Sequence, residues 1–233
     1  FVLDRGGKVF KQSAPVIKLP PSATFDDHMD LLGLLNSNTL GFWMKQVFHC
    51  KGYGASGDGA RTTATDWENF FEYDSTKLQQ APLTEKDRPA RIALAQVLDA
   101  TAQERAACLS SALLAGDWIA ADLPARLAAA RDRYRTLTHR MVALQEELDW
   151  LTYHSYGLLD EVETVGPDEV EPLATGHRPF EILAARTDEE ADPEEKSAWW
   201  SRHGHQKVTE IPEHYAAATR RRIQDRMDRI EAD

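Results

Sequence analysis

The chain has 233 residues, of which 42% are hydrophobic, and it carries a net charge of −11. This length suits one large domain or two small ones, and the hydrophobic fraction is enough for a buried core. No apolar run approaches the roughly 18 to 20 residues that cross a bilayer, which argues against a membrane protein. The two cysteines, Cys50 and Cys108, lie far apart without a CxxC partner. They argue against a disulfide framework or a zinc site and favour a reducing, cytoplasmic location.

The negative charge is concentrated in the last third of the sequence. Residues 156–233 contain 10 Lys and Arg against 19 Asp and Glu, a net charge of −9, whereas residues 1–84 and 85–155 each carry −1. Overall charge therefore gives no support to DNA binding, and a DNA contact would have to come from a local cluster. Because the sequence begins at Phe1 without a methionine, we expect it to be part of a longer protein.

Short strand-like runs open the chain. Residues 2–4 and 8–10 flank Arg5-Gly6-Gly7, and paired glycines supply the positive φ that a tight hairpin turn requires. A third strand candidate covers residues 14–19, where a proline indicates a strand start or a sheet edge, and Pro20-Pro21 ends it. These runs predict a small β-containing lobe.

Two helices are expected next, one on either side of Asn36-Ser37-Asn38. Thr24 and Asp27 have the spacing of a capping box, and a leucine stripe follows to residue 35. The polar triplet ends this helix, and any of its residues can cap a second helix that runs through Val47. We interpret Asn36 and Ser37 as caps, and the aromatic pair Phe42-Trp43 as core rather than as a platform for base stacking.

A glycine-rich run and an aromatic-rich run follow the second helix. Glycine at the density seen from Gly52 to Gly59 predicts a loop that adapts to a ligand or approaches it closely. We expect the aromatic residues between 66 and 73 to pack this loop back onto the body of the protein.

The middle of the chain has the clearest pattern. Apolar residues recur with alternating spacings of 4 and 3 from Leu123 to Leu151, an unbroken heptad pattern of about four heptads. The preceding helix, expected over residues 88–113, can fold antiparallel to it across a loop at Gly116-Asp117. We therefore predict a long helical hairpin that acts as a spacer. Arginines flank the heptad seam and leave a second interpretation open, contact with a phosphate backbone.

The last third alternates acidic loops with short helical segments. Trp199-Trp200 is expected to be an apolar anchor, and Arg220-Arg221-Arg222 begins a charged helix that we interpret as a solvated face, because acidic residues follow closely. The predicted fold class is α+β and mostly helical. It comprises a small β-containing recognition lobe (residues 1–84), a long helical hairpin (85–155) and an acidic helical C-terminal region (156–233).

Several motifs resemble the target-recognition region of type IIG adenine-specific DNA methyltransferases. They include Leu34-Leu35-Asn36-Ser37, Phe42-Trp43-Met44-Lys45-Gln46 and Lys77-Leu78-Gln79-Gln80-Ala81-Pro82-Leu83. The resemblance is greatest to the PglX-type methyltransferases of BREX phage-defence systems, and residues 144–150 and 180–182 extend it to later parts of the chain. It implies a parent protein that uses S-adenosylmethionine to methylate adenine in double-stranded DNA.

The catalytic motifs of that family have no counterpart in this chain. An adenine-N6 methyltransferase needs a glycine-rich cofactor loop after a strand, and an Asn/Asp-Pro-Pro-Tyr/Phe loop that holds a flipped base. Pro20-Pro21 has the wrong neighbours, and Gly52-Tyr53-Gly54 follows a helix. We therefore predict no catalytic, cofactor-binding or metal-binding residue here, and we expect an upstream methyltransferase domain of the same parent chain as a partner.

The candidate DNA contacts bracket the glycine-rich run. They are Lys45, His49, Lys51, Arg61, Thr62 and Thr63. Lys and Arg position phosphates, Arg also reads guanine edges, and Thr suits phosphates or thymine methyl groups. The alternative is a solvated loop with ordinary surface charges, in which the histidine packs or caps.

The favoured function is DNA recognition within a site-specific adenine-N6 DNA methyltransferase of a phage-defence system. A rival from a different class is a structural module whose heptad helices dock other subunits of a defence complex. A third hypothesis, a DNA mimic, is supported only by the acidity of the last third.

Overall fold

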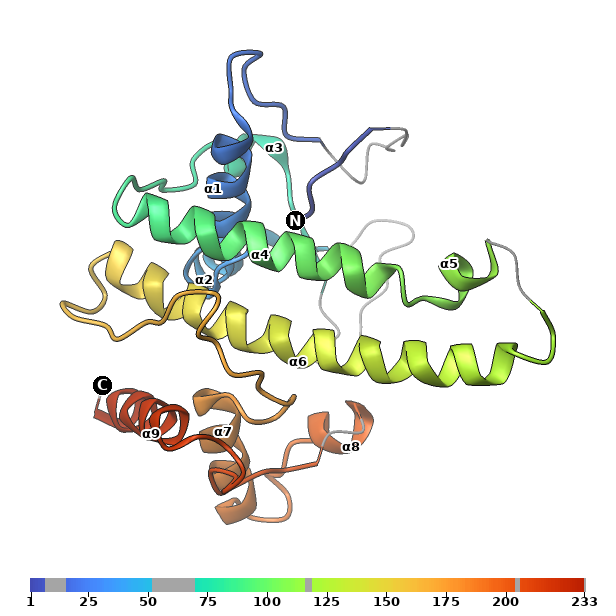
Figure 1. Cartoon of the computed structure of the whole chain (residues 1–233). Helices are drawn as coiled ribbons and strands as arrows, with labels where there is room; N and C mark the ends of the chain where they lie inside the picture. The colour runs from blue at the N-terminus through green and yellow to red at the C-terminus, as the bar shows by residue number, and fades with distance from the viewer. Residues whose placement is uncertain (7–15, 52–69, 116–118, 204–205, 233) are drawn as a thin grey trace, which may run out of the picture. The chain divides into compact units, whose positions relative to one another are not determined.

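The structure is a computed structural model that describes residues 1–6, 16–51, 70–115, 119–203 and 206–232. In this part of the chain helices dominate (Figure 1). The helices are α1 (Phe25–Leu35), α2 (Asn38–Val47), α3 (Ser75–Leu78), α4 (Arg88–Ala106), α5 (Ser110–Leu114), α6 (Leu123–Ser155), α7 (Pro179–Glu190), α8 (Trp199–His203) and α9 (Ala217–Ala232). The strands are β1 (His49–Lys51) and β2 (Phe70–Glu72), which pair antiparallel.

The predicted α+β fold class, with its β-containing recognition lobe, is wrong. Within the described residues the strands amount to one pair of three residues each, and neither coincides with an expected strand. Residues 2–4 and 16–19 have no regular secondary structure, and residues 8–10 lie outside the described residues. Val2 is 81% exposed, so its segment buries no apolar face against a partner strand. The backbone of Phe1 instead exchanges two hydrogen bonds with the side chain of Asn36.

The capping box predicted at the start of α1 is confirmed. The hydroxyl of Thr24 accepts a hydrogen bond from the Asp27 amide at 3.2 Å, and the carboxylate of Asp27 accepts one from the Thr24 amide at 2.7 Å. These bonds satisfy two backbone donors that have no partner inside the helix. The helix therefore begins where the polar spacing of the sequence indicates.

The chain forms two compact units. One consists of residues 1–95 and 148–162, and the other of residues 96–147 and 163–233. We call them the N-terminal unit and the C-terminal unit. Since α4 and α6 each contribute to both, the units are built from separate stretches of the chain. The three regions expected from the sequence stay a prediction about domain organisation.

A close crossing of α1 and α4 organises the N-terminal unit. A Cβ atom placed on Gly33 would lie 3.0 Å from Cγ of Arg91. Arg91 is completely buried, and its Nε donates to a carboxylate oxygen of Asp30 at 2.7 Å. The two remaining nitrogens of the guanidinium donate to the carbonyl oxygens of Lys86 and Thr84, each at 2.8 Å. Gly33 thus leaves the space that a buried and fully bonded arginine occupies.

In the C-terminal unit, the first part of α6 packs antiparallel to the last part of α4. The single helix Leu123–Ser155 covers the stretch where the heptad pattern predicts one. Arg133 Nη2 donates to Glu104 at 2.9 Å, and Arg105 lies over the ring of Tyr134 at 5.1 Å. The preceding helix is shorter than expected, because α4 ends at Ala106 and α5 is separate from it. Gly116-Asp117 lies outside the described residues.

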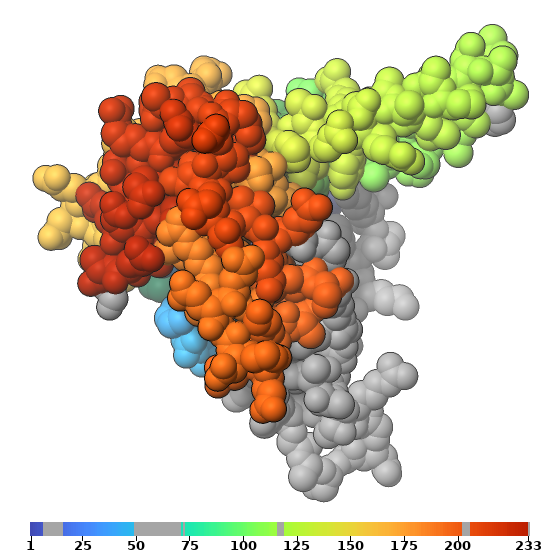
Figure 2. Space-filling view, turned by 90° about the horizontal axis from the view of Figure 1, so that it is seen from below, coloured from blue at the N-terminus to red at the C-terminus, as the bar shows by residue number. Residues whose placement is uncertain are grey.

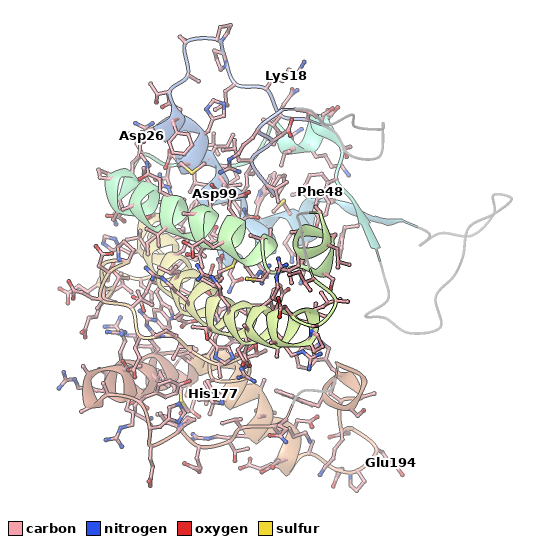
Figure 3. The ribbon with its side chains drawn as sticks, turned by 45° about the vertical axis from the view of Figure 1, so that its right-hand side comes forward. Lys18, Asp26, Phe48, Asp99, His177 and Glu194 are labelled. Carbon is pink, nitrogen blue, oxygen red and sulfur yellow. The ribbon has the colours of Figure 1, made fainter. Side chains whose placement is uncertain are left out.

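The rest of the C-terminal unit has its own core, in which α7 and α9 pack together. Its buried members are Ala143, Leu173, Ile182, Tyr215, Ile223 and Met227. The hydroxyl of Tyr215 accepts from the Ala174 amide at 3.1 Å and lies 2.7 Å from Nδ1 of His177. His177, which Figure 3 labels, is therefore held beside the first turn of α7.

A buried ionic cluster joins α6, α7 and α9 within this unit. Glu146 and Glu147 are 2% and 3% exposed, although they are adjacent on one helix. Arg178 Nε donates to Glu146 at 2.6 Å, Arg226 Nη2 donates to Glu147 at 2.9 Å, and Arg222 Nε lies 3.4 Å from Glu147. Burying such charges is costly unless each finds its partners, so the cluster favours the one packing of these helices that pairs them.

Candidate nucleic-acid interface

The Leu-Asn-Ser segment forms the joint between α1 and α2. Asn36 is the C-cap of α1, and Ser37 is the N-cap of α2. Ser37 is 2% exposed, and its Oγ donates to the Leu34 carbonyl at 2.7 Å while it accepts from the Leu40 amide at 3.3 Å. The interpretation of these residues as caps is confirmed. They fix the direction in which α2 leaves α1.

A hydrophobic cluster at the end of α2 gathers the motifs that carry the family resemblance. Leu40, Met44 and Phe48 are its buried members, and Trp43, Val47, Phe71, Leu78, Ala81 and Tyr156 pack against them. Phe48, which Figure 3 labels, makes edge-to-face contacts with Trp43 and Tyr73 at centroid distances of 6.3 and 5.0 Å. The Tyr156 hydroxyl donates to the Pro82 carbonyl at 2.6 Å. The motifs around residues 43 and 78–82 therefore build one scaffold.

The strand pair begins directly after α2 in the chain. Phe48 ends α2, and β1 begins at the next residue. In the antiparallel register His49 pairs with Glu72 and Lys51 with Phe70. Because Lys51 and Phe70 are direct partners, the two described residues that flank positions 52–69 are neighbours.

An exposed face of α2 adjoins the start of β1. Phe42 is 67% exposed, and Lys45 and Gln46 on the same side of the helix are exposed as well. The expectation that Phe42-Trp43 is a core pair is therefore right for Trp43, which packs in the cluster, and wrong for Phe42. Successive helical residues point about 100° apart, and here the face of α2 that buries Trp43 does not also bury Phe42.

The structure places half of the predicted DNA-contacting residues. Lys45 lies in the last turn of α2, and His49 and Lys51 are the first and last residues of β1. These three positions are brought to the same end of the scaffold by the α2–β1 connection. Arg61, Thr62 and Thr63 lie outside the described residues, and whether they come near Lys45 stays a prediction.

A Ser–Asp–His grouping in the N-terminal unit lacks the geometry of a nucleophile and its base. One carboxylate oxygen of Asp87 bonds both Ser155 Oγ at 2.8 Å and His154 Nδ1 at 2.7 Å. In a catalytic triad the serine bonds the histidine, whereas here both bond the carboxylate. Burial raises the pKa of Asp87, but the bonds from Ser155 and His154 outweigh it and hold that pKa below its ordinary value. The grouping ties the start of α4 to the end of α6.

Sequence reasoning missed the buried charges. Arg222 was interpreted as part of a solvated face, which holds for Arg220 and Arg221 but not for Arg222, whose side chain is 12% exposed. The available signal is the spacing of four between Arg222 and Arg226, which puts two cations on one helix face. For Arg91, the sequence offers no comparable signal.

Two searches of the described residues bear on other kinds of site. No helix in this part of the chain is both long and apolar enough to cross a membrane. In the same residues, no group of three or more His, Cys, Asp or Glu side chains is arranged to hold a metal ion.

Comparison with known proteins gives two matches. The family described as "Domain of unknown function (DUF7008)" matches residues 141–233. Over its whole length the chain is 41% identical to part of "Adenine-specific methyltransferase PglX" of Streptomyces coelicolor and spans 19% of that protein. No solved structure matches. The whole-length identity confirms the resemblance to PglX-type proteins that the sequence motifs indicate.

Proposed function

We propose, from the homology of this chain to the C-terminal part of a PglX adenine-specific methyltransferase, that it recognises the DNA site of such an enzyme. Methyl transfer would then belong to an upstream domain of the parent protein, which would bind S-adenosylmethionine and the flipped adenine. The present chain would hold the duplex in register. As the resemblance of the sequence motifs to the PglX-type methyltransferases of BREX systems implies, we also propose that the parent acts in phage defence in the cytoplasm.

The observation that carries the proposal is the geometry at the end of α2. The strand pair holds Lys51 opposite Phe70, so the two positions that flank residues 52–69 are neighbours beside the packed cluster at the end of α2. Binding residues are commonly placed on loops that a packed scaffold positions. The exposed side chains of Lys45 and Phe42 lie on α2, which leads into β1. A cation and an aromatic surface are the two groups that nucleic acids engage through phosphates and bases.

The charge distribution favours this end of the molecule over the C-terminal one. Residues 1–84 carry a net charge of −1, whereas residues 156–233 carry −9. Residues 156–233 repel phosphates far more strongly than residues 1–84, which favours a DNA contact in residues 1–84.

Fluorescence anisotropy of a labelled duplex with the intact parent protein tests the proposal. Lys45→Ala and Arg61→Ala should each weaken DNA binding and lower the slope of log affinity against log salt by about 0.9 per phosphate contact removed. Adenine methylation should fall at subsaturating DNA. Arg220→Ala is the matched control, because Arg220 is an exposed cation on α9.

Two results would count against DNA recognition. One is unchanged affinity and methylation in a protein that carries both Lys45→Ala and Arg61→Ala. The other is an equal loss of affinity in Arg220→Ala, which would indicate a general charge effect. If DNA binding is unaffected and partner subunits are lost on deletion of the heptad stretch of α6, the rival interaction module would be favoured.

A further inference from the structure

A groove of about 530 Å³ opens on the C-terminal unit between α7 and the segment that leads into α8. Phe180 and Ala184 line it from α7, Ala191 lines it just after that helix, and Trp199 and Trp200 line it from α8. Figure 2 looks onto the orange surface that this part of the chain forms. The lining is therefore mainly apolar, although it faces solvent.

The two outer aromatic residues of the groove are exposed. Phe180 is 44% and Trp199 is 38% exposed, whereas Trp200 is 8% exposed and anchors the pair. The rings of Trp199 and Trp200 meet edge to face, with centroids 5.0 Å apart. Exposed aromatic surface held by a buried neighbour is typical of the anchor sites of protein interfaces, where Trp contributes strongly.

The polar groups around the groove are acidic or uncharged. Glu181, Asp188 and Glu195 line it together with Thr187 and Ser197, and neither Lys nor Arg is among the described lining residues. Residues 179–201 contain 7 Asp and Glu against 2 Lys and Arg. α7 also ends here, at Glu190, so the negative end of its dipole adds to this charge. Glu194, labelled in Figure 3, lies in the connection between α7 and α8.

Some of these carboxylates stabilise the fold, and others are exposed to solvent. Asp188 is 8% exposed, accepts from the Ser197 amide at 2.6 Å and pairs with Lys207 at 2.5 Å. These contacts hold the connection against α7 and so shape the groove. Glu195, by contrast, lines the groove and is exposed, and its chain neighbour Glu194 is exposed as well. A bound cation can reach them without disturbing the pairing of Asp188.

We propose that this groove docks a cationic amphipathic segment of a partner protein. An apolar side chain of that segment would lie against Trp199 and Phe180, and its Lys or Arg residues would pair with the exposed carboxylates near Glu195. An arginine also stacks well on an aromatic ring, as Arg178 already does on Phe180 with its guanidinium 4.8 Å from the ring centroid. Phosphate backbones and anionic lipid surfaces are repelled by the same charge, which favours a basic protein segment over both.

A labelled helical peptide of Leu and Lys, with Leu at spacings of 3 and 4, is the first probe. Its analogue with Glu in place of Lys is the second. Anisotropy is measured with the intact protein that carries this chain. The Lys peptide should bind at least tenfold more tightly than the Glu peptide, and added salt should weaken its binding.

Variants of the groove locate that binding. Trp199→Ala should weaken it about tenfold, which is the loss expected for an aromatic anchor. Glu195→Lys should weaken it severalfold at low salt and less at high salt. Leu127→Ala is the matched control for the apolar change, because Leu127 is 37% exposed on α6, and Glu213→Lys is the control for the charge change. Both controls should bind as the unmodified protein does.

Equal binding of the Lys and Glu peptides would overturn the proposal, as would unchanged binding in Trp199→Ala. If Trp199→Ala lowers the unfolding temperature, Phe180→Ala on α7 replaces it, and unchanged binding in that variant has the same meaning. The assay is independent of DNA recognition, because duplex affinity should be the same in the Trp199→Ala and unmodified proteins. A loss of DNA binding in Lys45→Ala would leave peptide binding intact.

Discussion

Replacing Gly33 by alanine should destabilise the protein, although alanine is the better helix former. In an unobstructed helix interior the change stabilises by about 1 kcal/mol. At Gly33 the new methyl group would lie 3.0 Å from Cγ and 3.6 Å from Cδ of Arg91. Arg91 cannot swing away, because it is completely buried and its guanidinium bonds Asp30 and two backbone carbonyls.

The net effect follows from two opposing magnitudes. Forcing an extra methyl group into a well-packed core costs about 1–3 kcal/mol. Subtracting the gain of about 1 kcal/mol from helix propensity leaves a net loss of up to about 2 kcal/mol for Gly33→Ala. Displacing Arg91 from Asp30 instead would cost more, since it would break a buried ion pair.

Gly41 provides the matched control. It lies inside α2, in the same unit, and a Cβ atom placed there meets nothing within 4 Å. Gly41→Ala should therefore stabilise by up to about 1 kcal/mol. Urea unfolding followed by circular dichroism would measure both variants. A Gly33→Ala protein that is as stable as Gly41→Ala would refute the argument that Arg91 requires a glycine at this crossing.

Two further predictions concern the C-terminal unit. Arg226→Ala leaves buried carboxylates short of a partner and should lower the free energy of unfolding by about 3–5 kcal/mol in a urea titration. Arg222→Ala should lower it less, because the Arg222 side chain is 12% exposed and its Nε lies 3.4 Å from Glu147. Burial and two neighbouring histidines lower the pKa of His177 from 6.5, so its neutral form is favoured in the folded state. Its contribution to stability is fully present above pH 6.5 and is lost as the pH falls through the lowered pKa. Unfolding midpoints measured between pH 8 and pH 5 should therefore fall less in His177→Gln than in the unmodified protein, and identical slopes would contradict the assignment.

Sequence patterns predicted helices and their caps correctly where residues within a few turns determine the structure. The capping box at Thr24, the cap at Ser37 and the long heptad helix α6 all follow from spacing along a few turns. The expected β lobe failed because short strand-like runs form a sheet only where packing buries one of their faces, and Val2 is 81% exposed. Phe42 was misplaced for a related reason, since its neighbour Trp43 occupies the helix face that packs.

The candidate DNA interface was predictable in part. The sequence placed Lys45 at the end of α2 and His49 and Lys51 directly after it, because these are neighbouring positions in the chain. Their contact with DNA stays a prediction. The sequence could not indicate that β1 and β2 pair, since the partner of Lys51 lies beyond the whole glycine-rich run. The aromatic groove was visible only as the apolar dipeptide Trp199-Trp200, without the face of α7 that completes it.

By itself, then, the sequence determined the helices α1, α2 and α6, the caps at Thr24, Asn36 and Ser37, the acidic bias of the last third and the kinship with PglX-type methyltransferases. Each depends on residue order over short distances or on identity along the chain. Only the tertiary structure decided which charges are buried, which aromatics are exposed, and that Gly33 makes room for Arg91. These depend on contacts between residues far apart in sequence, such as Arg226 with Glu147. Burial of such pairs is set by how whole helices pack, which no local pattern encodes.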